Sequence, residues 1–304
     1  MIVKRKIIYI AGYSRSGSTI LDILLGSHTK IFGTGELFYL FEDWLNGTRT
    51  CTCGAVYKDC SFWKDLKLPQ GLSLQGAREI VQHVENRKYI TALTNGKIAP
   101  DIIQKYTLIQ TALYDYIFTT SGKDIVVDSS KTSRDMAGRF YALHQYTGFD
   151  VYVIHLVKNG LSVVESYVEK GRNWALEGYG KNDRFAAARS SVGWFLGNAI
   201  AQRLGAKMPA NRYIQIKYED LVAQPESVLQ KIGAFVDTDL SEVIAMIQNG
   251  LPFRPKHNVG GNRLRLEKEI RFKKSYNSKK IGLSVYHRLI FKIIAGKLYK
   301  KLGY

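Results

Sequence analysis

The sequence predicts an α/β protein with a doubly wound, mostly parallel β-sheet flanked by helices. Two expected strands, 124–128 and 151–157, are continuous apolar runs rather than alternating ones, as is typical of parallel strands that are covered on both faces. Helical patterns lie between the expected strands along the chain, which is typical of doubly wound sheets. Such sheets bind their ligands at the carboxyl ends of the strands, so functional residues are expected there.

The remaining elements follow from local patterns. An apolar strand at 7–11 enters a Gly/Ser turn that opens an apolar helix, and 30–36 is expected to be a short second strand. Segment 64–121 is expected to be mostly helical because its apolar residues recur at spacings of three and four. A further strand is expected at 213–216, and helices are expected at 135–146, 161–169, 184–204, 225–235 and 284–302.

The turn after the first strand predicts a phosphate-binding loop. From Gly12 to Thr19 the spacing G-x-x-x-x-G-x-[ST] matches a P-loop, except that Ser18 stands where the lysine is expected. Arg15 is the strong cation of this loop. Backbone N–H groups and the positive end of the following helix converge there on an anion, although a Gly/Ser turn can also be a plain connection. We expect the loop to bind phosphate, but not the triphosphate of an ordinary NTPase.

Length and composition indicate a folded protein of one large domain, or of one domain with an appendage. The chain has 304 residues and a formal net charge of +18, and its length allows a sizeable core. We expect a main domain at 1–270, with the helical 64–121 inserted into it, and a basic helical extension at 271–304. No apolar stretch reaches the roughly 18–20 residues needed to span a bilayer. The apolar run within 1–10 is too short for a signal peptide, so a cytoplasmic location is expected.

The positive charge is concentrated near the C-terminus. From Arg254 onward the chain has 15 Lys and Arg residues against two acidic ones. This imbalance favours a polyanion, an anionic membrane surface or an acidic glycan as a neighbour. Nucleic acid is not expected, since no recognised binding motif for it is visible. Segment 284–302 is a basic amphipathic helix that could lie peripherally on a membrane or pack on the core with a solvated basic face.

Three cysteines lie close together at Cys51, Cys53 and Cys60. An odd number in a chain without a signal peptide argues against a disulfide scaffold. Zinc would need a fourth ligand, such as His28 or His83, and the C-x-C spacing with one later cysteine is poor for zinc. Reduced structural cysteines, and no metal, are therefore expected.

A second anion site is expected after the 151–157 strand. Lys158 lies at the strand exit and Ser166 lies on the following helix, so the two could hold one anion between an ammonium and a hydroxyl group. Without other evidence, the simpler interpretation of the pair is a solvated lysine and a surface serine. Together with the first loop it indicates a ligand with two separated phosphates. The basic, glycine-rich stretch 254–265 offers N–H groups and arginines to the same ligand.

These motifs together resemble the sulfotransferases that use 3′-phosphoadenosine 5′-phosphosulfate (PAPS), in particular the bacterial branch with an R-S-G-S-T loop. Residues 14–19 are similar to the 5′-phosphosulfate loop of that family, and Lys158 and Ser166 to its Arg…Ser pair for the 3′-phosphate. The Y-E-D-L segment at 218–221, followed by Pro225, resembles the segment near the adenine, and 257–262 resembles the late glycine loop. The sequences at 127–131 and 51–63 also look like bacterial members.

The resemblance implies the sulfotransferase fold, PAPS as donor, PAP as product and no required metal. Two departures affect the cofactor: Lys158-Asn159-Gly160 replaces the usual Arg-Asp-Pro, and Ile20 replaces an aromatic residue that stacks on adenine in many members. Lysine cannot grip a phosphate in a bidentate manner, so weaker 3′-phosphate binding is expected. The implied cofactor contacts are Ser14, Arg15, Ser16, Gly17, Ser18, Thr19, Lys158, Ser166, Tyr218, Gly260, Gly261, Asn262, Arg263 and Arg265.

The expected reaction is in-line transfer of a sulfuryl group to a hydroxyl or amine of an acceptor. The protein positions the reactants and stabilises charge on the leaving oxygen, a role that we assign to Arg15. Glu36 is the expected base, with His28 as the alternative, and Lys131 is expected to assist the sulfonate or the acceptor. Each has a plainer reading: Glu36 could cap a helix or pair with Arg15, His28 could end its helix, and Lys131 could be solvated.

The sequence leaves the acceptor open among a carbohydrate, a glycolipid and a small lipid-like molecule. Segment 64–121 and the aromatic region 172–195 are expected to build the acceptor pocket, although an aromatic stripe is also typical of a core. Two other functions stay open. One is an atypical P-loop kinase or NTPase with Asp128 as a Walker-B-like carboxylate; the other is a non-catalytic anion-binding family member. The oligomeric state is not predicted.

Overall fold

A five-stranded parallel sheet forms the centre of the molecule, as the sequence predicts. The computed structural model describes residues 5–47, 49–170, 185–273 and 281–304. The strand order is β2-β3-β1-β4-β5, and every neighbouring pair is parallel. The strands are β1 (Lys6–Ala11), β2 (Ile31–Gly33), β3 (Ile125–Asp128), β4 (Asp150–Val157) and β5 (Tyr213–Lys217).

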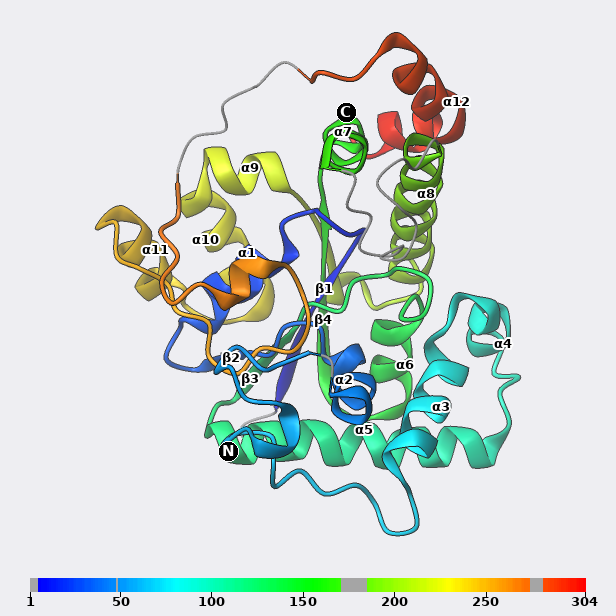
Figure 1. The fold of residues 1–304 in the computed structure, drawn as a ribbon, viewed down its shortest axis with the longest axis vertical. Helices are drawn as coiled ribbons and strands as arrows, with labels where there is room; N and C mark the ends of the chain where they lie inside the picture. Colours follow the sequence, from blue (N-terminus) through cyan, green and yellow to red (C-terminus); the bar gives the residue numbers. More distant parts are fainter. Residues whose placement is uncertain (1–4, 48, 171–184, 274–280) are drawn as a thin grey trace.

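Helices cover both faces of this sheet (Figure 1). On one face lie α1 (Ser18–Gly26), α9 (Tyr218–Ala223), α10 (Pro225–Val236) and α11 (Ser241–Gln248). On the other face lie α2 (Leu40–Asn46), α3 (Leu74–Glu85), α4 (Ile90–Thr94), α5 (Pro100–Ser121), α6 (Arg139–Tyr146) and α8 (Ala186–Gly205). Segment 64–121, which was expected to be mostly helical, contains α3, α4 and α5.

The continuous apolar strands are explained by these two layers. In β1, Ile7 and Tyr9 belong to the core on the α5 side, whereas Ile8 and Ile10 belong to the core on the α1 side. All four side chains are fully buried. A strand between two helical layers must be apolar at every position, because its alternate side chains enter opposite cores.

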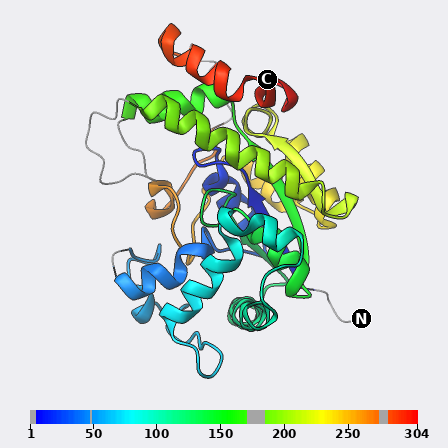
Figure 2. The same cartoon turned by 90° about the vertical axis from the view of Figure 1, so that its right-hand side faces the viewer.

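The C-terminal helix α12 (Val285–Lys301) packs on the body of the protein. It runs beside α8 (Figure 2) and also contacts α7 (Gly160–Lys170). The Phe291 ring packs edge-on against Trp194, with ring centroids 5.3 Å apart. Of the two alternatives for this segment, core packing is therefore observed, although Tyr286, Leu289 and Ile293 remain exposed. Among the described residues, no helix has both the length and the apolar character that crossing a membrane requires.

Candidate active site

The predicted phosphate loop connects β1 to the first turn of α1. Gly12, with φ +126°, and Gly17, with φ +91°, both require glycine: a Cβ would meet the Leu156 carbonyl oxygen at 2.4 Å in the first case and the Tyr218 ring at 2.3 Å in the second. Arg15 also has a positive φ, 65°. The glycines therefore let the loop lie tightly against β4 and Tyr218, with the N-terminus of α1 behind it.

Arg15 connects this loop to the predicted second anion site. Its Nη1 donates a hydrogen bond of 3.0 Å to the Ser166 hydroxyl on α7, and its guanidinium lies 4.8 Å from the centre of the Tyr167 ring. Lys158 lies beside them, with its Nζ 4.2 Å from the centre of the Tyr218 ring. Ser166 is thus paired with Arg15, and the two predicted anion sites form one continuous region.

A large cleft joins these residues. Its volume is about 1150 Å³. Each of the five strands contributes a lining residue just beyond its carboxyl end, which is where a doubly wound sheet places its ligands. In strand order these residues are Glu36 after β2, Lys131 after β3, Arg15 after β1, Lys158 after β4 and Tyr218 after β5.

The cleft brings together nearly all of the expected cofactor contacts. It is lined by Ser14, Arg15, Gly17, Ser18, Thr19, Lys158, Ser166, Tyr218, Gly260, Gly261, Asn262, Arg263 and Arg265. Ser16 is the exception, because its side chain is buried beneath the loop and does not line the cleft.

Glu36 and Lys131 form a buried ion pair at the cleft wall. Lys131 adopts a positive φ, 72°, and Tyr9 donates a hydrogen bond to its backbone carbonyl. The Glu36 side chain makes no helix-capping hydrogen bond. The partner of Glu36 is therefore Lys131, and neither of the plainer readings of Glu36, a cap or a pair with Arg15, describes its contacts.

The late glycine loop, 257–262, lies directly on this pair. The Glu36 N–H donates to the Val259 carbonyl at 2.6 Å, and the Asn262 N–H donates to the Thr19 hydroxyl at 3.3 Å. Gly261 has φ +93°, and a Cβ there would lie 3.6 Å from the Glu36 carboxylate. The expected base, the phosphate loop and the glycine loop thus form one packed unit.

Asp22 holds this unit from behind. It is fully buried and accepts hydrogen bonds from the Gly35 N–H at 3.0 Å and the Asn258 side-chain amide at 2.7 Å. Burial raises the pKa of Asp22 to about 7. The sequence analysis did not identify Asp22, since a single acidic residue in an apolar helix gives no spacing signal.

Several lining residues also lie outside the predicted set. Tyr39 and Arg49 line the cleft, with the guanidinium of Arg49 5.0 Å from the centre of the Tyr39 ring. Arg271 and Lys273 add positive charge at the same opening. A weak signal existed for the last two, because the basic stretch that begins at Arg254 continues through them.

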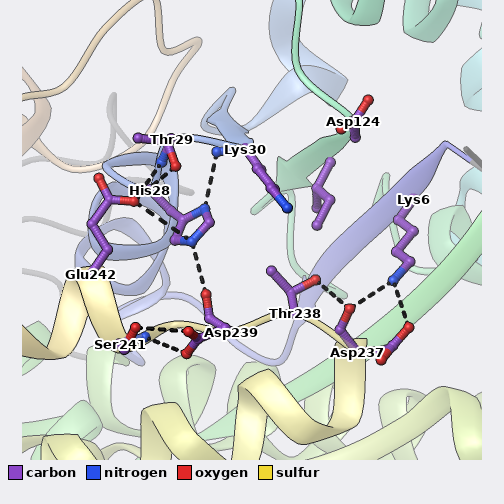
Figure 3. Close-up of a pocket in the computed structure, with 11 residues that line it drawn as sticks. Lys6, His28, Thr29, Lys30, Asp124, Asp237, Thr238, Asp239, Ser241 and Glu242 are labelled. Atoms are coloured by element: carbon purple, nitrogen blue, oxygen red, sulfur yellow. Dashed lines mark hydrogen bonds and ion pairs between the residues drawn. The ribbon is translucent and has the colours of Figure 1, made fainter.

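The structure corrects the assignment of His28 as an alternative base. His28 lines a separate pocket of about 470 Å³ with Lys6 and Asp124, at the amino ends of the strands (Figure 3). Its Nε2 lies 2.9 Å from the Asp239 carbonyl oxygen, and its Nδ1 accepts from the Lys30 N–H at 3.0 Å. A histidine at this edge of the sheet cannot reach the reacting groups, so the plainer reading, a residue that ends its helix, describes it.

Asp128 ends β3 beside β1, but it does not line the cleft. It is fully buried in a network in which Arg139 Nε and the Tyr114 hydroxyl each donate to it at 2.7 Å. Arg139 also bonds to Glu85 at 2.7 Å, whose pKa burial raises to about 7. These partners bind the carboxylate on the α5–α6 side of the sheet and give it a structural role.

Two segments, 64–121 and 172–195, were expected to build the acceptor pocket, and the structure describes the first fully and the second in part. Among residues 64–121, all of which the structure describes, none lines the cleft. In the 172–195 region, Trp174 and Tyr179 lie outside the described residues. Trp194 is buried against α12 and belongs to the core, whereas Phe185 is exposed.

Solved structures of other proteins share this fold. Solved structures with the same fold include the sulfotransferase domain from the curacin biosynthetic pathway, with a TM-score of 0.56 and 20% identity over 97% of each chain. The sulfotransferase domain of the Synechococcus PCC 7002 olefin synthase has a TM-score of 0.54 and 19% identity over 97% of this chain and 94% of that one. Sulfotransferase STF1 from Mycobacterium tuberculosis H37Rv has a TM-score of 0.50 and 14% identity, over 96% and 77% respectively.

A search of curated sequences gives no significant match. A sequence profile described as the sulfotransferase family, however, matches residues 73–242, which is more than half of the chain. This match takes in β3, β4 and β5 together with Lys131, Lys158, Ser166 and Tyr218 of the cleft. The chain belongs to the sulfotransferase family.

Proposed function

We propose that the protein transfers a sulfuryl group from PAPS to a hydroxyl or amine of an acceptor and releases PAP. One observation carries this proposal: Arg15, Ser166 and Lys158 line the same cleft as the Glu36–Lys131 pair. A donor with phosphates at both ends would reach both anion-binding regions, and its reacting end would lie near the carboxylate.

Each group has a defined part in the proposed reaction. Loop N–H groups from Ser16 to Thr19 would hold the 5′-phosphate, and the Ser166 and Lys158 side chains would contact the 3′-phosphate. Arg15 would stabilise negative charge on the transferring sulfonate and on the bridging oxygen as the S–O bond breaks. In phosphoryl transfer a metal ion supplies much of this stabilisation. Here a guanidinium and backbone N–H groups would supply it, so we propose turnover without added divalent ion.

Glu36 would accept the proton of the acceptor hydroxyl as its oxygen bonds to sulfur. Lys131 pairs with its carboxylate, and the hydrogen bond from its N–H to Val259 fixes its backbone. Little reorganisation of the Glu36 side chain would therefore be needed for proton transfer. Lys131 would remain charged beside it and would attract the sulfonate oxygens toward the acceptor. Such positioned proton transfer typically contributes about 10²–10⁴-fold to a rate.

The charge of the cleft supports an acceptor with acidic groups. Arg49, Arg271 and Lys273 line it in addition to the cations assigned to the donor. Clustered positive charge raises the local concentration of anions. We therefore favour an anionic carbohydrate or glycolipid over a neutral lipid-like molecule. Peripheral membrane contact through the exposed residues of α12 remains a prediction, to be tested by salt-dependent pelleting with anionic liposomes.

A thermal-shift comparison tests the donor. The expected result is a higher unfolding temperature with PAP in the absence of metal, and no comparable shift with ATP and magnesium, because Ser18 replaces the P-loop lysine and Asp128 is bound elsewhere. Stabilisation by ATP and magnesium alone would overturn the proposal. Labelled PAPS with a panel of sulfate-free glycans then tests turnover, and PAP binding without transfer to any hydroxyl or amine would favour the non-catalytic alternative.

A further inference from the structure

Three cysteines and one histidine converge below the glycine loop. Cys51, Cys53 and Cys60 come from the segment before α3, and His257 begins the late glycine loop, roughly 200 residues away along the chain. Their four ligand atoms all lie within 4.8 Å of one another. Two ligands are buried and one is partly exposed, while Cys53 lies at the surface.

Three of the distances between these atoms are close to the edges of a tetrahedron around zinc. With Zn–S near 2.3 Å and Zn–N near 2.05 Å, a tetrahedral site places two sulfurs about 3.8 Å apart and a sulfur and a nitrogen about 3.6 Å apart. Here Cys53 Sγ lies 3.6 Å from Cys60 Sγ. His257 Nδ1 lies 3.6 Å from Cys51 Sγ and 3.3 Å from Cys60 Sγ. All four atoms, none more than 4.8 Å from another, are close enough together to bind one zinc ion.

The fourth ligand corrects the expectation from the sequence. His28 lies in the pocket of Figure 3, and the His83 ring stacks on Tyr89 with ring centroids 4.3 Å apart. His257 takes the place that neither of them fills. A disulfide fits less well, because the Cys53–Cys60 sulfur separation of 3.6 Å far exceeds the roughly 2.05 Å of an S–S bond.

The surroundings hold the ligands in a binding arrangement. Between Cys51 and Ala55 the chain makes a tight turn, with Gly54 at φ +89° and its N–H bonded to the Cys51 carbonyl at 2.9 Å. The His257 ring stacks on Phe62, with ring centroids 5.2 Å apart. Trp63 Nε1 donates to the His257 carbonyl at 3.0 Å. These contacts orient Nδ1 toward the sulfurs, as supporting contacts do for metal-bound histidines.

We propose that Cys51, Cys53, Cys60 and His257 bind one structural zinc ion. Thiolate and imidazole ligands favour zinc, and a site whose four positions are all protein ligands leaves none for substrate. The site would clamp the 51–60 segment to the glycine loop, since His257 lies three residues before Gly260 at the cleft. Asn258 already bonds to Thr52 at 3.0 Å, and the metal would reinforce that contact.

Metal analysis of the purified protein tests this proposal directly. The protein, isolated without a polyhistidine tag and in the presence of reductant, should contain about one zinc per chain and no iron. Replacement by Co²⁺ should give the intense visible bands of a tetrahedral, thiolate-bound ion. Neither readout depends on transfer activity, so a failure of the proposed donor would leave this test intact.

Variants at single ligands sharpen the test. Because Cys53 is exposed, Cys53→Ser is expected to fold. It should lower zinc affinity by more than about 100-fold, since even the loss of a residue supporting a ligand costs about 10- to 100-fold. His257→Ala should do the same, whereas the control His83→Ala should retain full zinc content. Circular dichroism would confirm that each variant is folded.

Three results would overturn the proposal. One is a wild-type protein that contains no zinc and gives no tetrahedral Co²⁺ spectrum after reduction and reconstitution. Another is iron in place of zinc. The third is a folded Cys53→Ser variant that binds zinc as tightly as the wild type. Chelation of the wild type should also lower its unfolding temperature, and should do so far less in Cys53→Ser.

Discussion

Glu36, the proposed base, is held at both its side chain and its backbone. Its carboxylate forms an ion pair with Lys131, and the backbone N–H of Glu36 donates to the Val259 carbonyl. The residue thus belongs to both the strand-end turn and the glycine loop that covers it. An acceptor that enters the cleft would meet a carboxylate that is already oriented.

Glu36→Gln is expected to remove most turnover and to leave PAP binding nearly unchanged. The amide keeps the size of the side chain but cannot accept the acceptor proton, which predicts a loss of about 10²–10⁴-fold in kcat. Calorimetric titration with PAP gives the binding constant, and radiolabelled transfer gives kcat. Unchanged turnover would assign the base role to another residue.

Arg15 and Ser166 are expected to act as a coupled pair. Arg15→Ala should reduce catalysis more than PAP affinity, whereas Ser166→Ala and Lys158→Ala should mainly weaken PAP binding. Because Arg15 donates directly to Ser166, the effects of Arg15→Ala and Ser166→Ala on PAP affinity should deviate from additivity by about 0.5–3 kcal/mol in a double-mutant cycle. Lys158→Ala combined with Arg134→Ala, at a largely exposed residue that does not line the cleft, serves as the additive reference.

At the scale of elements, a buried polar network joins β3 to the helical layer on the α5 side. Arg139 of α6 bonds to Asp128 at the end of β3 and to Glu85 at the end of α3, both at 2.7 Å. Both carboxylates and the guanidinium are almost fully buried. Removing one partner of such a network leaves an uncompensated buried charge.

Arg139→Ala is therefore expected to lower the free energy of unfolding by about 3–5 kcal/mol. Arg134→Ala is the matched control, because its side chain is largely exposed and lies 4.0 Å from Asp135. That control should change stability by less than about 0.5 kcal/mol. Urea titration followed by circular dichroism measures both, and equal effects would contradict a structural role for the network.

Element geometry also explains which site residues were predictable. The phosphate loop, Glu36, Lys131 and Lys158 each come just after a strand with a clear apolar signature, so strand polarity places them at one edge of the sheet. His28 was misplaced because it follows α1, whose nine residues span about 13 Å. That length returns the chain to the amino edge before β2 begins. His28 is therefore close to the phosphate loop in the sequence but lies at the opposite edge of the sheet.

At the scale of the whole molecule, long-range contacts were beyond what spacing could show. The meeting of His257 with three cysteines, and the packing of α12 on α8, depend on how distant segments close on one another. Neither leaves a local pattern. The continuous apolar runs of the strands, in contrast, indicate that both faces of the sheet are buried, and they were sufficient to predict the sheet.

The acid stability of the molecule should depend on His155 in β4. It is fully buried, with Nδ1 2.7 Å from the Tyr213 hydroxyl and Nε2 2.9 Å from Asn198 Oδ1. Burial lowers the pKa of His155 from 6.5 to about 4. Between pH 6.5 and pH 4 the imidazole therefore binds a proton in the unfolded chain but not in the native state. The free energy of unfolding consequently falls as the pH drops from about 6.5 toward 4.

His155→Gln removes this titration while retaining polar contacts. Between pH 8 and pH 5, the wild type should lose about 2 kcal/mol of unfolding free energy more than the variant does. The comparison isolates His155, because the raised pKa values of Asp22 and Glu85 are common to both proteins. Urea unfolding at the two pH values provides the measurement, and parallel losses would refute the assignment.

Tyr304, which follows α12, is linked to the turn that contains Lys158. The Tyr304 hydroxyl donates to Glu219 at 2.6 Å, and the other carboxylate oxygen of Glu219 accepts from the Asn159 N–H at 2.9 Å. Removal of Tyr304 would thus take one hydrogen bond from the carboxylate that accepts from Asn159, the residue next to Lys158 at the proposed nucleotide site. Variants that lack Tyr304 should be tested for weaker binding of PAP before a loss of transfer activity is attributed to the proposed catalytic residues.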